Sequence, residues 1–112
     1  MSEFVRYLEE VFRDFGPITA RRMFGGHGIY YQGRMFGLVA DDVLYLKADA
    51  ESAPAFIERG MSPFQYVKNN RPMQMSYYTA PEEIYDDPEV ASDWARMAWE
   101  AACRSAKPDR KK

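Results

Sequence analysis

Residues 21–47 read RRMFGGHGIYYQGRMFGLVADDVLYLK, and this stretch decides the fold that we expect. Apolar and aromatic runs alternate with short glycine-rich or acidic links, which is the pattern of consecutive β-strands. The predicted strands are 18–24, 29–32, 35–40 and 43–47, separated by a tight turn or bulge at 25–28 and by turns at 33–34 and 41–42. Because such short links join neighbouring strands, antiparallel pairing is predicted.

A helix is predicted before this stretch. Residues 2–15 place apolar side chains at steps of three and four, which makes one apolar stripe on a helix. The stripe consists of Phe4, Leu8, Val11, Phe12 and Phe15. Gly16-Pro17 ends this helix, because glycine can take the left-handed cap and proline cannot continue the hydrogen-bond ladder.

A second, short helix is predicted within 49–60. Ser52 is its expected N-cap, since this choice places Pro54 in the first turn, where a missing N–H costs nothing. Phe56 and Ile57 are expected to face inward.

Two further strands follow, over 64–69 and 73–78, joined through 69–72. Thr79 and Glu82 have the spacing of a capping box, which predicts a short helical turn after the last strand.

Asp87-Pro88-Glu89 predicts the start of a last helix, because it combines an N-cap residue, a proline at the first helical position and an acid in the first turn. The helix is expected to run to about Ser105. Its apolar stripe is Val90, Trp94, Met97, Ala98 and Ala101, widened by Trp99 and Cys103. The element order α-β-β-β-β-α-β-β-α predicts an α+β fold with helices flanking an antiparallel sheet.

The composition fits a single domain, which we expect to span 1–106 and to precede a disordered basic tail over 107–112. The 46% of hydrophobic residues can form a core, and the net charge of −2 gives no general attraction to nucleic acid or membrane. Cys103 is the only cysteine, which excludes an intrachain disulfide and favours a cytoplasmic location. No apolar run approaches the roughly 18–20 residues of a transmembrane helix, so no membrane partner is expected.

The sequence offers no catalytic or metal-binding constellation. His27 and Cys103 are single residues of their kind, whereas a zinc site needs three or four ligands. The glycines at 25–28 lack the lysine of a P-loop and lead into a strand, so a permissive turn is favoured over an anion site. We therefore predict no enzyme, no metal and no cofactor. A small-ligand pocket near this turn is kept as an alternative.

Aromatic and basic residues alternate along the predicted strands. Tyr45 and Lys47 share one strand face, Tyr66 and Lys68 share another, and Tyr77 follows Met75 on a third. With the arginines near strand ends, the candidate interaction surface is Arg21, Arg22, Arg34, Tyr45, Lys47, Tyr66, Lys68, Arg71 and Tyr77. Such a surface is typical of single-stranded nucleic-acid binding. Ordinary cross-strand packing is the favoured interpretation, partly because acidic residues balance the basic ones in every third of the chain.

Several segments carry a family resemblance. They are RRMFGGHGIY at 21–30, MFGLVA at 35–40, VLYLKAD at 43–49, PFQY at 63–66 and MQMSYY at 73–78. Together they resemble the N-terminal domain of the TfoX/Sxy family of competence regulators, over roughly residues 4–105.

The resemblance implies an α/β module similar to type III secretion chaperones. Full-length members assist transcription of competence genes together with a cyclic-AMP receptor protein, and they carry a second, helical domain that we expect this chain to lack. The family has no established catalytic residues to transfer. We therefore expect a non-enzymatic regulatory or protein-interaction domain whose partner is the transcription machinery. A homodimer is a further expectation, and direct nucleic-acid binding is the alternative function.

Overall fold

The computed structural model describes residues 3–23 and 25–106, without the side chains of 66–68 and 72–75. The predicted tail over 107–112 lies outside the described residues. The elements are α1 (Glu3–Val11), β1 (Thr19–Met23), β2 (Gly26–Tyr31), β3 (Arg34–Ala40), β4 (Val43–Lys47), α2 (Ala53–Glu58), β5 (Pro63–Lys68), β6 (Arg71–Thr79), the 3₁₀ turn η1 (Glu82–Tyr85) and α3 (Pro88–Ser105). The predicted α+β fold and its element order are confirmed.

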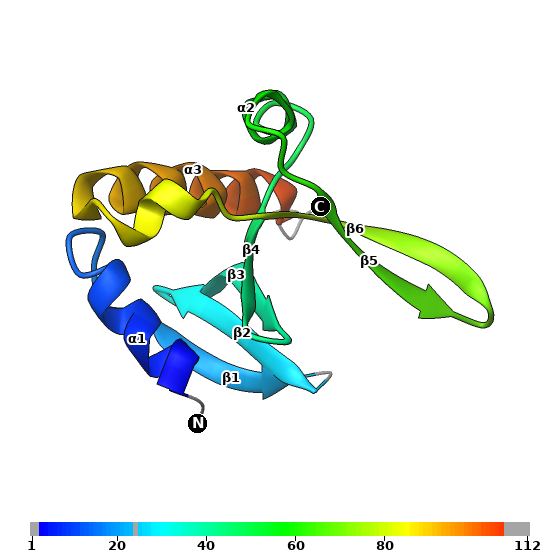
Figure 1. The fold of residues 1–112 in the computed structure, drawn as a ribbon, viewed down its shortest axis with the longest axis horizontal. Helices are drawn as coiled ribbons and strands as arrows, with labels where there is room; N and C mark the ends of the chain where they lie inside the picture. The colour runs from blue at the N-terminus through cyan, green and yellow to red at the C-terminus, as the bar shows by residue number, and fades with distance from the viewer. Residues whose placement is uncertain (1–2, 24, 107–112) are drawn as a thin grey trace, which may run out of the picture.

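The strands form one antiparallel sheet in the order β1-β2-β3-β4-β6-β5. The first four strands are a meander, and β6 pairs with β4 while β5 takes the outer position. Figure 1 shows α1 and α3 beside the meander, whereas the hairpin of β5 and β6 extends away from these helices. The sheet therefore has two margins, β1 and β5.

Two-residue turns close three hairpins. Their central residues all have positive φ: Gln32 (50°) and Gly33 (79°), Asp41 (53°) and Asp42 (59°), Asn69 (55°) and Asn70 (62°). Turns with two left-handed residues match the right-handed twist of the strands that they join. The predicted turn at 41–42 is confirmed, but the preceding one lies at 32–33, because Arg34 already begins β3.

The prediction of a tight turn or bulge over 25–28 is wrong for its last three residues. Gly26, His27 and Gly28 belong to β2, and His27 pairs with Arg22 on one side and with Val39 on the other. The glycines serve close packing within the sheet. A Cβ on Gly26 would lie 2.0 Å from the carbonyl oxygen of Val39, so a larger residue could not take this position without a backbone shift.

The core lies between one face of the sheet and the helices. Its largest fully buried side chains include Phe12, Phe36 and Phe56, which come from three different regions of the chain. α3 packs on β3 and β4 through small residues, and the list of its buried residues is Ala91, Ser92, Ala95, Ala98, Ala101 and Ala102. The predicted stripe on α3 is confirmed, because Ala98 and Ala101 are fully buried. The larger members of the stripe are half-buried beside this alanine face and pack against the core: Val90, Trp94, Met97 and Trp99.

Two other helix predictions need correction. α1 ends at Val11, and the chain continues in turns in which the Phe15 and Gly16 N–H groups both donate to the Phe12 carbonyl. On α2, Phe56 is completely buried but Ile57 is 59% exposed, so only one of these two residues faces inward. Adjacent helical residues lie about 100° apart around the axis, and a six-residue helix can bury one of them without the other.

The predicted caps have different outcomes. Asp87 caps α3 as expected, since its Oδ1 accepts a hydrogen bond of 2.9 Å from the Glu89 N–H. Thr79 forms no capping box, because its hydroxyl donates to the Ser62 carbonyl and Pro81 is the N-cap of η1. Within the described ranges, no helix has the length and apolar character needed to cross a membrane.

Candidate interaction surface

The second face of the sheet is the candidate interaction surface. Ala20, Ile29 and Leu46 point toward the helices, so their neighbours in sequence point away. No helix in the described part of the chain packs its buried residues on that other face. We call it the helix-free face, formed by Arg21, Met23, Gly28, Tyr30, Met35, Leu38, Tyr45, Lys47, Phe64 and Tyr77.

The half of the helix-free face formed by β1 to β3 is organised around Gly28. A Cβ on this glycine would lie 2.7 Å from Met23 Sδ, 3.0 Å from Met35 Sδ and 3.1 Å from Tyr30 Cε1. These three side chains therefore converge above the glycine. The Arg21 guanidinium lies 5.7 Å from the centroid of the Tyr30 ring, a distance at which a cation is attracted to an aromatic face.

The other half is formed by β4, β5 and β6. Lys47 Nζ lies 5.3 Å from the Tyr77 ring centroid and donates a hydrogen bond of 2.6 Å to Ser76 Oγ. The Tyr45 ring packs edge-on against Phe64, with the two centroids 4.8 Å apart. The hydrogen bond to Ser76 and the contact with the Tyr77 ring hold the Lys47 side chain in one place on the sheet, whereas a fully solvated lysine would sample many rotamers.

The centre of the helix-free face is dry. Leu38 and Tyr77 are only 4% and 7% exposed, although they lie on the face away from the helices. Burial, together with the nearby Tyr30, raises the pKa of Tyr77 to about 12. The face therefore combines an apolar centre with the cations of Arg21 and Lys47 at its sides.

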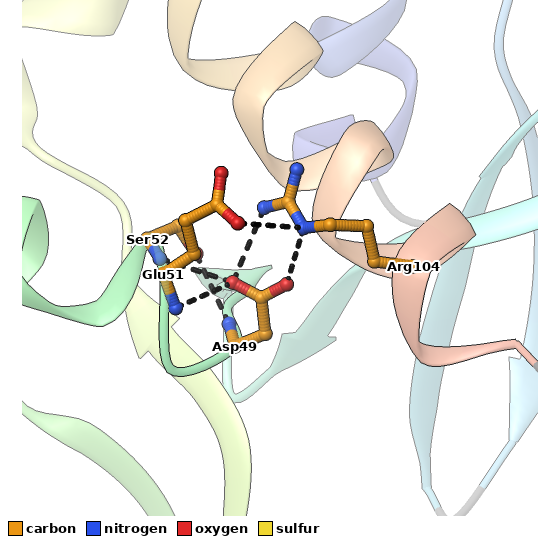
Figure 2. A network of polar contacts seen from close by, with 4 residues as sticks. All are labelled: Asp49, Glu51, Ser52 and Arg104. Carbon is orange, nitrogen blue, oxygen red and sulfur yellow. Dashed lines mark hydrogen bonds and ion pairs between the residues drawn. The ribbon is translucent and has the colours of Figure 1, made fainter.

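A polar network fixes the chain directly after Lys47. Arg104 Nε donates to Asp49 Oδ2 at 2.7 Å, and its Nη2 donates to Oδ1 at 3.2 Å (Figure 2). Asp49 Oδ1 also accepts from the Ser52 N–H, while Ser52 Oγ accepts from the Asp49 N–H. Ser52 thus occupies the predicted N-cap position, but its hydroxyl bonds to the preceding Asp49 N–H and does not cap α2. The network joins the loop after β4 to the last turn of α3.

Asp49 and Lys47 both have shifted pKa values, for different reasons. The hydrogen bond from Arg104 is the main reason why the pKa of Asp49 falls to about 2. Burial lowers the pKa of Lys47, and the nearby Asp49 carboxylate opposes this shift. The lysine is therefore a cation held partly out of water, which favours contact with an anionic group that replaces its solvation.

The structure brings together only part of the predicted surface. Arg21, Tyr45, Lys47 and Tyr77 share the helix-free face. Arg22 pairs with His27 on the opposite face of β1, whereas Arg34 and Arg71 are exposed at the starts of β3 and β6. The register pairs Tyr66 with Met73 and Lys68 with Arg71, but the side chains of Tyr66 and Lys68 lie outside the described residues.

Sequence reasoning missed the methionine part of the face. Met23 and Met35 lie on different strands, and only the convergence above Gly28 relates them. The alternation of Arg21 with Met23 along β1 was the available signal, since residues two apart in a strand share a face.

A cavity of about 190 Å³ lies between α1 and the segment from η1 to α3, away from the helix-free face. Its lining includes Tyr7, Glu10, Arg13 and Tyr85. Most small-molecule sites have volumes of about 300–1,000 Å³, so this cavity is small for such a ligand. His27 does not line it. Within residues 3–23 and 25–106, no three His, Cys, Asp or Glu side chains come close enough together to hold a metal ion.

The family model of the TfoX N-terminal domain matches residues 10–102 of the chain. The chain belongs to the TfoX N-terminal domain family. It is 35% identical over 80 residues to the DNA transformation protein TfoX1 of Aliivibrio fischeri. The matched region covers 68% of this chain and 38% of that protein. It is 27% identical over 77 residues to the protein Sxy of Escherichia coli K12, covering 69% and 37% respectively.

The family resemblance predicted from the sequence is thus confirmed. This TfoX N-terminal domain spans less than two fifths of the length of either relative. Neither relative's name designates an enzyme.

Proposed function

We propose that this TfoX N-terminal domain is a non-enzymatic regulatory module of the cytoplasm that binds a protein partner through its helix-free face. The proposed partner belongs to the transcription machinery, and the proposed outcome is regulation of competence-type genes. The name of the Aliivibrio fischeri relative, a DNA transformation protein, supports this role.

The single observation that carries the proposal is the composition of the helix-free face. Met23, Tyr30 and Met35 are half-buried and converge over Gly28. The cations of Arg21 and Lys47 lie on the same face. Protein interfaces are enriched in aromatic residues, methionine and arginine, with polar groups at the rim. Methionine adapts its shape to a partner because its side chain is unbranched and flexible.

Direct nucleic-acid binding by the same face is the alternative. A base stacks only on an exposed ring, but Tyr77 is 7% exposed and the Tyr45 ring packs edge-on against Phe64. These rings are engaged within the protein, which argues against base stacking on them.

The proposal is tested by binding to purified RNA polymerase and cyclic-AMP receptor protein, measured by biolayer interferometry. The double variant Arg21→Glu, Lys47→Glu reverses both cations of the helix-free face. A matched control, Arg6→Glu with Arg96→Glu, reverses two exposed cations on α1 and α3. We expect the first variant to bind about tenfold more weakly, since reversing charges at an interface replaces attraction with repulsion. The control should bind like the wild-type domain.

Equal weakening by both double variants would contradict the proposed face, and absence of binding by the wild-type domain would contradict the proposed partner. A salt titration with single-stranded and duplex DNA distinguishes direct nucleic-acid binding from binding to a protein. Phosphate contacts are strongest at low salt, so binding there that Arg21→Glu, Lys47→Glu abolishes would favour a nucleic-acid interface.

A further inference from the structure

β1 is an open margin of the sheet (Figure 1). Among the described strands it pairs only with β2, so alternate residues direct their N–H and C=O groups away from the sheet. Thr19, Arg21 and Arg22 are exposed, and the strand contains no proline. Its backbone is therefore free to pair with another extended chain.

The three strands nearest this margin, β1 to β3, contain basic residues and no acidic ones. No acidic residue occurs between Asp14 and Asp41, whereas Arg21, Arg22 and Arg34 all lie in that interval. The whole chain nevertheless has a net charge of −2, so its acids are concentrated elsewhere. The folding of β1 to β3 side by side gathers these cations at one end of the sheet, which gives the margin a charge complementary to an acidic segment.

The two arginines of β1 point to opposite faces. Arg21 pairs with Gly28 on the helix-free face, and Arg22 pairs with His27 on the other. A strand added beside β1 can pair acidic side chains with both arginines only if it carries one acid on each of its faces. Because successive side chains of a strand alternate between faces, those acids must be consecutive in its sequence.

A second copy of this chain fits the margin poorly. Antiparallel pairing of two β1 strands about their central residue places Arg21 against Arg21, and like charges directly opposite one another destabilise a sheet. The free N–H and C=O groups also favour a polypeptide over a nucleic acid, because a peptide backbone completes a hydrogen-bond ladder and a phosphate backbone does not.

We propose that β1 binds an extended segment of a partner protein as an added antiparallel strand, and that this segment carries two consecutive acidic residues opposite Arg21 and Arg22. The proposal specifies the partner class of the protein-interaction function proposed above, on which it rests. The helix-free face, which Arg21 borders, is continuous with the added strand.

The probe is the capped peptide acetyl-Val-Glu-Glu-Val-Thr-amide, whose antiparallel register places its glutamates opposite Arg22 and Arg21. The control peptide, acetyl-Glu-Val-Thr-Val-Glu-amide, has the same composition but separates its acids onto one face. Affinity and residue-specific amide exchange are measured by NMR on the nitrogen-15-labelled chain.

We expect the probe to bind about tenfold more tightly than the control, because the probe can place an acid opposite each of the two exposed arginines. The β1 amides that point away from β2 should gain protection from exchange. The variant Arg21→Glu, Arg22→Glu should lose binding of the probe and gain binding of acetyl-Val-Lys-Lys-Val-Thr-amide, which shows that the variant still folds and pairs.

Equal affinities for the two acidic peptides, binding without amide protection in β1, or no binding would each overturn the strand addition. Tighter binding of an oligothymidylate that displaces the probe would overturn it in favour of a nucleic-acid edge. If the peptide fails while Lys47→Glu still weakens binding to RNA polymerase, only the strand addition is wrong. Failure of both measurements contradicts the proposed function as well.

Discussion

Lys47 and Tyr77 oppose each other across β4 and β6, with the lysine Nζ 5.3 Å from the centre of the tyrosine ring. The pair lies on the helix-free face, and Tyr77 is nevertheless buried. The sheet therefore carries apolar packing on both faces: the main core under the helices, and a smaller cluster on the helix-free face. Variants that test binding should change the cations at the sides of that cluster, because changes at its centre also alter stability.

Burial of Tyr77 predicts a late alkaline titration. Its pKa is about 12, against an ordinary value of 10.0, so its neutral form is stabilised by folding. This stabilisation is complete below pH 10 and is lost as the pH rises toward 12. The difference between the tyrosinate absorbance titrations of the wild type and Tyr77→Phe should have a midpoint near 12. A midpoint near the ordinary value of 10.0 would contradict the buried position.

The Asp49 network predicts an acid-sensitive contribution to stability. Folding lowers the pKa of Asp49 from 3.8 to about 2, so the stabilisation is present above pH 3.8 and is lost as the pH falls through 2. Asp49→Asn should lower the free energy of unfolding at pH 7 by about 1 kcal/mol, because the contact is partly solvated. Urea unfolding of both proteins measures this difference, which should shrink below pH 3.8 and disappear as the pH falls through 2. A difference that is independent of pH would exclude the ionic contact as its cause.

Adjacent residues of α2 provide a matched test of the core. Phe56 is completely buried and packs against the Tyr78 and Trp94 rings, whereas Ile57 is 59% exposed. We expect Phe56→Ala to reduce the free energy of unfolding by about 3–5 kcal/mol through the cavity that it leaves. Ile57→Ala should change it by less than about 0.5 kcal/mol. Chemical denaturation of the two variants checks both values. Similar losses would contradict the finding that Phe56 faces inward and Ile57 does not.

A larger side chain at Gly28 requires Met23 and Met35 to move. A Cβ there would approach Met23 Sδ to 2.7 Å, so Gly28→Val should destabilise the protein by about 1–3 kcal/mol through overpacking. Adding Met23→Ala should recover part of this loss, since it vacates the space above the glycine. Thermal unfolding of the two variants measures the effect. A double variant less stable than Gly28→Val alone would show that the methionine does not crowd this position.

Local signals predicted most of the fold. The run over 43–47 became β4 with the expected bounds, and Asp87-Pro88-Glu89 began α3, because turn residues and caps act through neighbours in sequence. The glycines at 26 and 28 were interpreted as a turn, since their role depends on Val39 and Met35, which are distant in sequence. Spacing alone could not reveal that these positions need small residues inside a sheet.

The candidate surface shows the same limit. Strand alternation correctly placed Tyr45 with Lys47, but it could not place β6 beside β4, and this pairing is what brings Tyr77 to Lys47. Arg22 was grouped with Arg21 because both arginines were expected near strand ends, although adjacent residues of a strand lie on opposite faces. Pairings between strands that are distant in sequence therefore determined which predicted residues meet.

Site-specific photo-cross-linking tests most directly whether the helix-free face contacts a protein partner. The photoreactive residue p-benzoylphenylalanine would replace Tyr45 on this face or Ile57, which is exposed on α2. In the presence of RNA polymerase and cyclic-AMP receptor protein, we expect cross-links from position 45 and none from position 57. Cross-links from position 57 alone, or equally from both positions, would contradict the account.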